Sequence, residues 1–600
     1  MVSTMALRAR LSGTFCKLYN DLSYNCRQSH NKYATASATQ SKSELKSKYD
    51  VVIVGAGHNG LVSAAYLQEA GLNVCVVERR HVIGGAAVTE EIIPGFKFSR
   101  ASYVLSLLRP KIVQDLELKK YGLEVYLRDP SSYTPLLNPG GRDGKARSLL
   151  LHRDSQKTAE SIAQFSQKDA KNWIEYEKQL EHIVSAIEPL MDNAPVSLPN
   201  VMAPTIREQL KSLPAILTLL KSLKGLGKET DAFYELMTAP TTKILDKWFE
   251  SEPLKATLAT DSVIGAMISP KTPGSGYVLL HHVMGELDGV KGAWGIVKGG
   301  MGAVSQSIAN CAVDRGASIF TEAPVQEILA DNDTVKGVLL QDGTAIEAKA
   351  VLSNATPKVT YLDLLPEGNL PEDMMSELRN LDYTSPVTKI NVAVKELPNF
   401  VADPNIRKNE VMPHHRATIH LNCEHSDLIH EGFLDAQAGK FSRKPMIEMV
   451  IPTSLDPTMA PPGCHVCLLF TQYTPYHLAD GQEWDDGNRN RYADTVFDDI
   501  EQYAPGFKAS VIGRDILTPP DLEKTFNLTG GNIFHGTMGL DQLYMSRPTT
   551  RLSNYKSPVR GLYLCGSGAH PGGGVMGSAG RLAAMETLSF FKRKYVKNNK

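Results

Sequence analysis

Three glycines with the spacing G-x-G-x-x-G form the clearest chemical pattern in this chain. They are Gly55, Gly57 and Gly60, and Glu78 follows 18 residues after the last of them. Gly55 permits a tight turn, Gly57 lets a pyrophosphate approach the backbone, and Gly60 allows a helix to pack closely on a strand. A carboxylate at Glu78 can accept hydrogen bonds from an adenosine ribose. The pattern predicts a dinucleotide-binding site.

Two strands and a helix must hold these residues in place. Residues 50–54 are mostly β-branched and predict a buried parallel strand, residues 61–71 have a helical pattern, and residues 73–77 predict a second strand. The phosphates would then meet free N–H groups at the helix N-terminus, where the helix dipole favours negative charge. This complete unit is a far more specific signal than the glycines alone.

The residues after Glu78 indicate which dinucleotide binds. Arg79 follows directly, and a glycine pair, Gly84-Gly85, precedes Thr89. A chain that turns back over a pyrophosphate needs glycines, because its backbone runs against the ligand and φ can be positive. The extension resembles the FAD-binding signature of glutathione-reductase-type flavoproteins, in particular the amine oxidase and phytoene desaturase branch. That resemblance implies FAD as the cofactor, with Arg79, Gly84 and Gly85 among the residues that bind it.

A central segment has a second set of cofactor candidates. Gly299-Gly300 precedes a helical stretch, and strands then begin near Val325. The segment resembles the centre of phytoene desaturase-like enzymes, where a glycine pair opens a helix beside the cofactor. In that family the residue matching Val325 contacts the adenine through its backbone. A helix start and a β-meander without a ligand is the alternative.

The third glycine-rich segment lies near the C-terminus, where a predicted strand ends at Gly566 and a helix is predicted from about Val575. Gly566, Gly574, Val575 and Met576 are the cofactor-binding candidates here. The N–H groups of such a helix start are suited to stabilise negative charge at N1 and O2 of a reduced flavin. A flexible linker is the alternative, but linkers are not flanked by a strand and a helix.

With all three segments, the resemblance covers residues 49–600 and is closest to the phytoene dehydrogenase-like and carotenoid isomerase-like group. It implies an α/β fold with a glutathione-reductase-type, Rossmann-like FAD-binding domain and an interleaved α+β substrate domain. We assign residues 49–150, 290–375 and 535–600 to the FAD domain. The substrate domain then comprises residues 151–289 and 376–534, the first part mainly helical.

Lys389 is the candidate catalytic residue. Residues 388–394 alternate polar and apolar side chains, as a half-buried strand should. Amine oxidases have a lysine at the matching place that holds a water against flavin N5, and the resemblance implies the same for Lys389. A surface lysine on that strand is at least as good an interpretation. Residues 573–576 lack the aromatic cage residue of amine oxidases, which favours a long apolar substrate over a small amine.

Histidines and cysteines add little. His281, His282 and His535 could carry protons, but structural histidines are the better interpretation. Cys464 and Cys467 form a C-x-x-C pair at the start of an apolar run, which predicts a buried strand and not a reactive thiol at a helix N-terminus. No second pair is present for zinc, so no metal site is predicted.

Composition bounds the partners. The chain has 600 residues, which implies at least two domains, and a net charge of −1 with no concentrated basic stripe, so nucleic acid is not expected. No apolar run approaches the roughly 18 residues that span a bilayer. The most lipophilic stretch, residues 213–220, predicts a helix packed on its own domain. A lipid-tunnel wall or a peripheral membrane contact is the alternative.

The first 48 residues differ from the rest. They contain eight Lys or Arg and two acidic residues, and Leu7, Leu11, Phe15, Leu18 and Leu22 recur at helical spacing. A basic, amphipathic, acid-poor leader is typical of mitochondrial transit peptides, so we expect the mitochondrion, and there the matrix. A tail without function is the alternative. Residues 28–48 read as a linker.

Three functions are consistent with these patterns. The first is an FAD-dependent oxidoreductase in which the flavin takes a hydride from an apolar, lipid or isoprenoid-like substrate, with an unidentified electron acceptor. The second is redox-neutral isomerisation of a polyene. The third is a non-catalytic lipid-binding or interaction protein, as the GDP-dissociation inhibitors are on this fold; those proteins lack an intact nucleotide site, whereas all three FAD segments are complete here.

Overall fold

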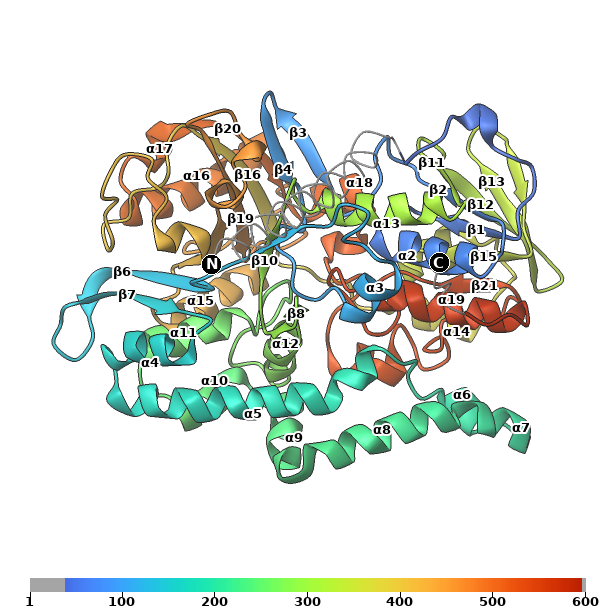
Figure 1. Ribbon diagram of the computed structural model, residues 1–600, viewed down its shortest axis with the longest axis horizontal. Coiled ribbons are helices and arrows are strands. Elements are labelled where there is room, and N and C mark those ends of the chain that lie inside the picture. The colour runs from blue at the N-terminus through green and yellow to red at the C-terminus, as the bar shows by residue number, and fades with distance from the viewer. Residues whose placement is uncertain (1–37, 596–600) are drawn as a thin grey trace, which may run out of the picture.

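A computed structural model describes residues 38–595 (Figure 1). The leader expected over residues 1–48 therefore lies mostly outside the described residues, and mitochondrial targeting stays a prediction. Two sheets occupy opposite sides of the molecule, and a layer of helices runs beneath them. No described helix combines the length and the apolar character needed to cross a membrane.

The first sheet is parallel and has the strand order β11-β2-β1-β15-β21. Its strands are β1 (Val51–Val54), β2 (Val74–Val77), β11 (Ser318–Phe320), β15 (Ala350–Ser353) and β21 (Leu562–Leu564). The strands come from three distant parts of the chain, as predicted. Every residue of β1 and β2 is buried, because elements cover both faces of this sheet.

Helices and a small antiparallel sheet provide that cover. Helix α2 (His58–Glu69) packs against α13 (Gly302–Asp314) and α19 (Ser578–Phe590), and β13 contacts β15. The antiparallel sheet comprises β12 (Val325–Asp331), β13 (Thr334–Leu340) and β14 (Ala345–Glu347). The strands predicted from near Val325 are thus present, and one hydrophobic core joins these elements.

The second sheet has seven strands in the order β20-β16-β19-β18-β17-β6-β7. These are β6 (Ser132–Gly140), β7 (Ala146–Leu151), β16 (Thr388–Val394), β17 (Thr418–Leu421), β18 (Met446–Val450), β19 (His465–Gln472) and β20 (Val511–Leu517). Sheet membership moves one domain boundary, because residues 132–151 pair with this sheet and not with the FAD sheet to which we assigned residues up to 150. The other boundaries stay predictions.

Strand β16 is buried at all seven positions, so the prediction of a half-buried strand was wrong. It lies between β19 and β20, and apolar clusters cover both of its faces. On one face Ile390 and Val392 join a large core, and on the other Ala393 packs with Phe96 and Phe98. The polar positions of the alternating pattern therefore do not face solvent.

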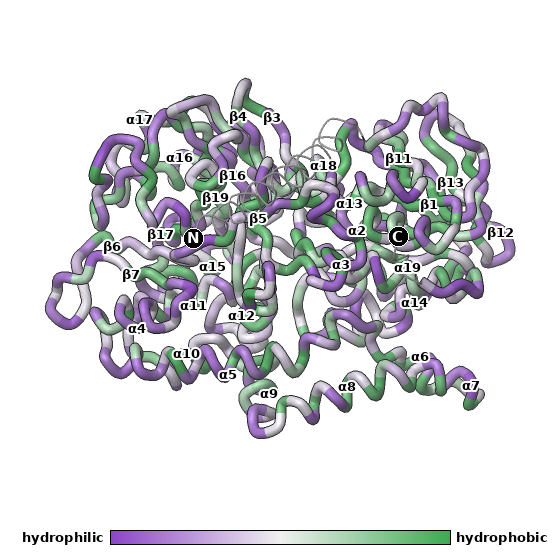
Figure 2. The backbone as a smooth tube through the Cα atoms, in the orientation of Figure 1, coloured by the Kyte–Doolittle hydropathy of each residue, from purple (hydrophilic) through white to green (hydrophobic). Residues whose placement is uncertain are grey.

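The part between β7 and residue 289 is mainly helical, as predicted. Its helices are α4 (Ser155–Ala163), α5 (Gln167–Met191), α6 (Leu198–Val201), α7 (Ile206–Gln209), α8 (Leu213–Leu226), α9 (Thr230–Thr238), α10 (Thr241–Trp248), α11 (Glu252–Thr260) and α12 (Ser275–His282). The long helix α5 runs along one side of the molecule, and α8 lies outside it (Figure 1). Figure 2 shows hydrophobic residues recurring along α8 at this outer position.

Shorter elements connect these units. They are the strands β3 (Thr89–Ile93), β4 (Phe96–Ser99), β5 (Val125–Leu127), β8 (Glu286–Leu287), β9 (Val290–Lys291) and β10 (Gly295–Val297), and the helices α3 (Pro110–Asp115), α14 (Glu372–Arg379), α15 (Ser426–Gln437), α16 (Asp486–Tyr503), α17 (Phe507–Ser510) and α18 (Pro519–Phe526). Strand β5 pairs with β10, and β3 pairs with β4.

Helix α19 begins at Ser578, so the prediction of a helix from about Val575 was wrong. Gly572, Gly574 and Gly577 have φ angles of 118°, 100° and 77°, which no helix residue adopts. Gly574, Val575 and Met576 therefore lie in a turn before the helix. Their N–H groups are not those of a helix first turn.

Candidate functional site

The loop between β1 and α2 has the geometry that the three glycines predict. Gly55 has a φ of 95°, and Gly57 is the N-cap of α2 without a side-chain cap. A Cβ on Gly60 would lie 2.3 Å from the carbonyl oxygen of Gly55, so only glycine fits this close packing of helix on strand. The N-terminus of α2 thus presents backbone N–H groups without a side-chain partner at the cap.

Glu78 lies buried at the end of β2, beside this loop. One of its carboxylate oxygens accepts the Ala56 N–H and the other accepts the Arg80 N–H, both at 2.9 Å. These bonds fix the carboxylate and leave lone pairs for a ribose. The Arg79 guanidinium instead donates to the carbonyl oxygens of Lys524 and Thr525 at the end of α18, so its side chain is turned away from the glycines.

The Gly84-Gly85 pair passes directly over the glycine loop. The Gly84 N–H donates to the Ala56 carbonyl at 2.9 Å, and a Cβ on Gly85 would lie 3.5 Å from the Gly57 Cα. Both glycines have positive φ angles, of 113° and 57°. The predicted turn of the chain back over the pyrophosphate position is present.

The central segment also contacts the chain that follows the Gly84-Gly85 turn. The Thr89 Oγ1 accepts the Gly302 N–H at 2.9 Å, and a Cβ on Gly300 would lie 2.4 Å from the same oxygen. The N–H of the other glycine, Gly299, donates to Asp456 at 2.7 Å. Val325 is the first residue of β12 and is half-buried, and the Ala323 N–H two residues earlier donates to the Glu78 carbonyl at 2.8 Å.

Two asparagines that were not predicted lie where the three segments meet. Asn59, inside the glycine motif, donates to the Ser567 Oγ at 3.1 Å and accepts the Gly580 N–H at 3.3 Å. Asn354 follows β15, and a Cβ on Gly566 would lie 2.6 Å from its carbonyl oxygen. Its position just after a buried strand, like that of Glu78, was a signal that could have identified it.

A cavity of about 1080 Å³ extends from this region into the second domain. His58, Ser567, Gly574 and Val575 line the end beside the glycine-rich segments. Met576 is not part of the lining and is buried against a helical core. Most of the wall is apolar, and its lining includes Leu105, Leu107, Trp173, Leu258, Leu279 and Phe534.

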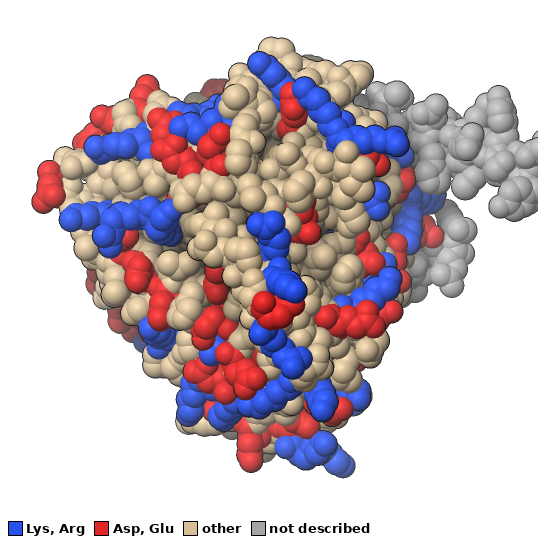
Figure 3. Space-filling model, turned by 90° about the vertical axis from the view of Figure 1, so that its left-hand side faces the viewer, with Lys and Arg blue, Asp and Glu red and all other residues tan. Residues whose placement is uncertain are grey.

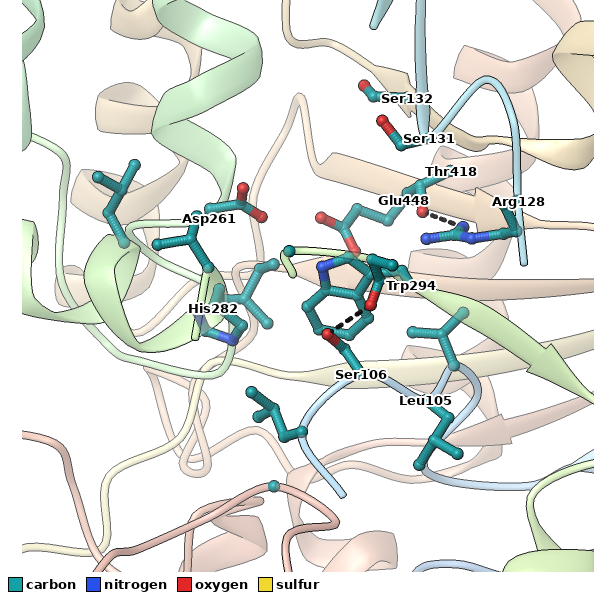
Figure 4. A pocket seen from close by; sticks show the side chains of 18 of the residues that line it. Leu105, Ser106, Arg128, Ser131, Ser132, Asp261, His282, Trp294, Thr418 and Glu448 are labelled. Carbon is teal, nitrogen blue, oxygen red and sulfur yellow. Dashed lines mark hydrogen bonds between the residues drawn. The ribbon is translucent and has the colours of Figure 1, made fainter. Parts of the chain in front are cut away.

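One part of the cavity lining, which we call the polar end, is rich in polar side chains (Figure 4). The Tyr103 hydroxyl donates to Glu448 at 2.6 Å, and Arg128 donates to the Thr418 Oγ1 at 2.5 Å. Figure 4 shows the carboxyl groups of Asp261 and Glu448 pointing toward each other. No sequence pattern indicates this group, because its members are spread over more than three hundred residues.

Burial perturbs the ionisation of these groups. Desolvation raises the pKa of Glu448 to about 7 and the pKa of Asp261 to about 7, and the repulsion between the two carboxylates adds to the shift of Asp261. Burial lowers the pKa of Arg128 to about 10, and its Nε has no hydrogen-bond partner among the described residues. A buried guanidinium with a free donor and two carboxyl groups that gain a proton near neutrality can bind a polar group of a ligand.

Lys389 also lines the cavity, on β16, and only 1% of its surface is exposed. The interpretation as a surface lysine was therefore wrong. Its Nζ donates to the Asn391 Oδ1 at 2.6 Å and lies 5.4 Å from the centre of the Tyr103 ring. Desolvation lowers the pKa of Lys389 to about 7, and the Asp515 carboxylate opposes this shift. Its catalytic role stays a prediction.

Replacing this lysine is expected to stabilise the fold in a pH-dependent way. The pKa of Lys389 falls from 10.5 to about 7, so between these values the unfolded chain binds one more proton than the folded chain. The free energy of unfolding of the wild type therefore rises with pH across this window. Lys389→Met should unfold at a higher urea concentration than the wild type at about pH 6, and the difference should shrink toward about pH 9.

Lys395→Met, at an exposed position just after β16, is the matched control and should show no such trend. A Lys389→Met protein that is less stable than the wild type at both pH values would contradict the burial argument.

The histidine and cysteine candidates are mostly buried. His281, His282 and His535 are deep in the molecule, and desolvation lowers their pKa values to about 3, 4 and 3. His282 and His535 line the cavity. Cys467 is buried in β19 and both cysteines of the C-x-x-C pair are free thiols, which agrees with the prediction of a buried strand.

These elements define a class of protein: an FAD-binding oxidoreductase fold, in which three glycine-rich chain segments converge beside one end of a large cavity. The family model for flavin containing amine oxidoreductases matches residues 60–434. The chain belongs to this family, and FAD is its cofactor.

Relatives agree with this assignment. The chain is 59% identical over 541 residues to pyridine nucleotide-disulfide oxidoreductase domain-containing protein 2 of Rattus norvegicus, with 90% of this chain and 93% of that protein covered. It is 25% identical to the phytoene desaturase (lycopene-forming) of Pseudescherichia vulneris, over 90% and 98% of the two chains. The phytoene desaturase resemblance is confirmed.

A solved structure shows the same fold. Wild-type putrescine oxidase bound to putrescine superposes with a TM-score of 0.52 at 15% identity, over 91% of this chain and 99% of that chain. The predicted α/β fold with an FAD-binding domain is confirmed.

Proposed function

We propose that this protein is an oxidoreductase in which bound FAD takes a hydride from a largely apolar, lipid or isoprenoid-like substrate. The cavity of about 1080 Å³ carries this proposal, because it joins the glycine-rich segments to an apolar chamber in the second domain. The similarity to a phytoene desaturase supports an extended hydrocarbon as the kind of substrate. The turn at Gly574 and Val575 also has no aromatic side chain that would clamp a small amine.

The residues present fit FAD. The Gly57 loop and the Gly84-Gly85 turn leave no side chain between the two backbones, and Glu78 is fixed where a ribose hydroxyl can donate to it. The bound cofactor would supply the hydride acceptor. The chain itself contributes the apolar wall, which excludes water and orients the substrate, and Lys389, whose pKa near 7 lets it hold or release a proton at Nζ.

The polar end of the cavity implies that the substrate carries one polar group. Arg128 can donate from its free Nε, and a protonated Glu448 or Asp261 can donate or accept. An oxygen on the substrate would thus satisfy groups that are otherwise costly to bury. This arrangement would fix which carbon of a long chain lies nearest the flavin.

Anaerobic titration of the purified flavoprotein with apolar lipid fractions tests the proposal. We expect one fraction to bleach the visible absorption of the oxidised flavin, and the substrate to be recovered with one more double bond. Ile264→Trp, which fills part of the cavity, should slow bleaching at least about tenfold, whereas Ile512→Trp, at an exposed position, should not.

Other outcomes decide between the alternatives. A flavin that dithionite reduces but no lipid fraction bleaches would contradict hydride transfer. Isomerisation of a polyene by the reduced protein would favour the redox-neutral function. Retention of an unchanged lipid in either redox state would favour the non-catalytic binding protein.

A further inference from the structure

Helices α6 to α8 expose a continuous row of large apolar side chains. Residues 206–226 form one unbroken helical run, in which spacings of three or four residues place the apolar side chains along one side, and Leu198 and Met202 precede this run across a break at residues 202–205. This apolar row consists of Leu198, Met202, Ile206, Leu210, Leu213, Leu217, Leu220 and Leu223. Met202 is 81% exposed and Ile206 is 74% exposed. Monomeric proteins rarely leave a connected patch of this size in water, because burying each such side chain is worth about 1.5–3 kcal/mol.

The apolar row does not pack against the rest of the protein. Within α8 only Ser222 and Leu226 are buried. Gly225 lies over Ala186 of α5, where an added Cβ would be 3.5 Å from the Ala186 Cβ. Ser222, Gly225 and Leu226 therefore lie on the side of α8 that faces α5, and the leucines of the row point outward. The prediction that residues 213–220 pack on their own domain was thus wrong for the four exposed residues, Leu213, Pro214, Leu217 and Leu220, whereas the other four are half-buried.

The charge beside the row is mainly positive. Residues 198–228 contain five basic residues and one acidic residue, Glu208. Four of the basic side chains, those of Arg207, Lys211, Lys221 and Lys224, form no salt bridge among the described residues. By contrast, the face of the molecule in Figure 3 mixes both signs. Near an anionic lipid surface each such cation gains about 1 kcal/mol.

A second copy of the chain fits this surface poorly. A two-fold contact would bring the same patch of both copies together, and the unpaired cations of one copy would face those of the other. Like charges brought together across an interface oppose association. An anionic lipid surface matches both the apolar row and the positive charge, because acyl chains can contact the leucines and acidic headgroups can pair with the lysines.

We propose that the apolar row of α6 to α8 docks the protein on an anionic lipid surface. The leucines lie at the boundary of headgroups and acyl chains, and Lys221 and Lys224 reach the headgroups. Helix α5, on which α8 packs, contributes Trp173, Leu180 and Val184 to the cavity wall. Docking therefore brings the cavity close to a source of apolar molecules. The docking itself does not depend on the proposed flavin chemistry.

Flotation of the full chain with vesicles tests this docking. Vesicles of phosphatidylcholine with phosphatidylglycerol should retain the wild type, and pure phosphatidylcholine vesicles should retain it less. The double variant Leu217→Glu, Leu220→Glu should lower the vesicle-bound fraction at least about tenfold, because two apolar side chains are replaced by charges that the surface repels. The Lys221→Gln, Lys224→Gln variant should bind less and lose part of its salt dependence.

The matched control is Ile512→Glu, Leu540→Glu, which charges two exposed apolar positions outside the row. All of these variants keep residues 1–37, so a contribution of that basic segment cancels in the comparison. Flavin content should stay at the wild-type level in each, which shows that the fold is intact. Undiminished vesicle binding by Leu217→Glu, Leu220→Glu overturns the proposal. A change in oligomeric state of that variant, with vesicle binding retained, also overturns it and identifies a second copy as the occupant.

Discussion

Gly57→Val is expected to abolish retention of FAD. Gly57 is the N-cap of α2, and the Gly85 backbone passes beside it. A Cβ at this position would lie 2.5 Å from the Nδ2 of Asn354, and the two methyl groups of valine would occupy the space in which a pyrophosphate must approach the backbone. We expect the purified variant to lose at least about 90% of its flavin, an effect of more than about 1.4 kcal/mol on binding.

Flavin absorbance per protein after gel filtration measures this loss, and circular dichroism checks the fold. Gly140→Val is the matched control, because a Cβ at Gly140 meets only a methyl group of Leu136 at an ordinary 3.5 Å. If Gly57→Val retained its flavin in full, the assignment of this loop to the pyrophosphate would be wrong.

Arg547→Met is expected to lower the free energy of unfolding by about 3–5 kcal/mol. The Arg547 guanidinium is among the largest fully buried groups of the described residues. It donates to backbone carbonyls at distances of 2.5 to 3.3 Å. These carbonyls belong to Phe534, Gly536, Thr537, Gln542 and Ser567. Methionine fills the volume but leaves these buried acceptors without donors, and removing one partner from a buried charged network costs about 3–5 kcal/mol.

Urea unfolding monitored by tryptophan fluorescence measures this change. Arg551→Met is the control: Arg551 pairs with Asp373 and Glu377 at exposed positions, and its loss should cost less than about 1 kcal/mol. Because Arg547 also holds the Ser567 carbonyl, the variant should bind flavin more weakly as well. A variant as stable as the wild type would show that water replaces the guanidinium at these carbonyls.

The dinucleotide site could be predicted from the sequence because its determinants are local. A tight turn, a close helix–strand contact and an acid at a strand end each require a particular residue type, and all three lie within thirty residues of chain. Gly55, Gly60 and Glu78 have the positions in the structure that this pattern predicts. Contacts between distant segments produce no such local sequence pattern. Arg128, Asp261 and Glu448 come together only because strands and helices from distant segments surround one cavity.

Some errors have the same origin. The alternation in β16 predicts solvent on one face, but β3, β4 and neighbouring residues cover that face and bury Lys389. The sequence pattern predicts the start of α19 three residues too early, because it does not reveal which glycines adopt positive φ. Both errors concern how the chain packs or turns, and not which elements form.

The order of strands in the parallel sheet has a consequence for biosynthesis. Strand β21 completes this sheet beside β15. The Asn59 side chain can form its hydrogen bond to Ser567 only after a residue 508 positions later has been synthesised. The ribosome therefore synthesises the amino-terminal glycine loop long before the carboxy-terminal segment that packs against it. Until the last segment emerges, the nascent sheet has an open edge at β15, and such edges invite chaperones or aggregation. Premature termination anywhere before residue 562 would leave that edge permanently unpaired.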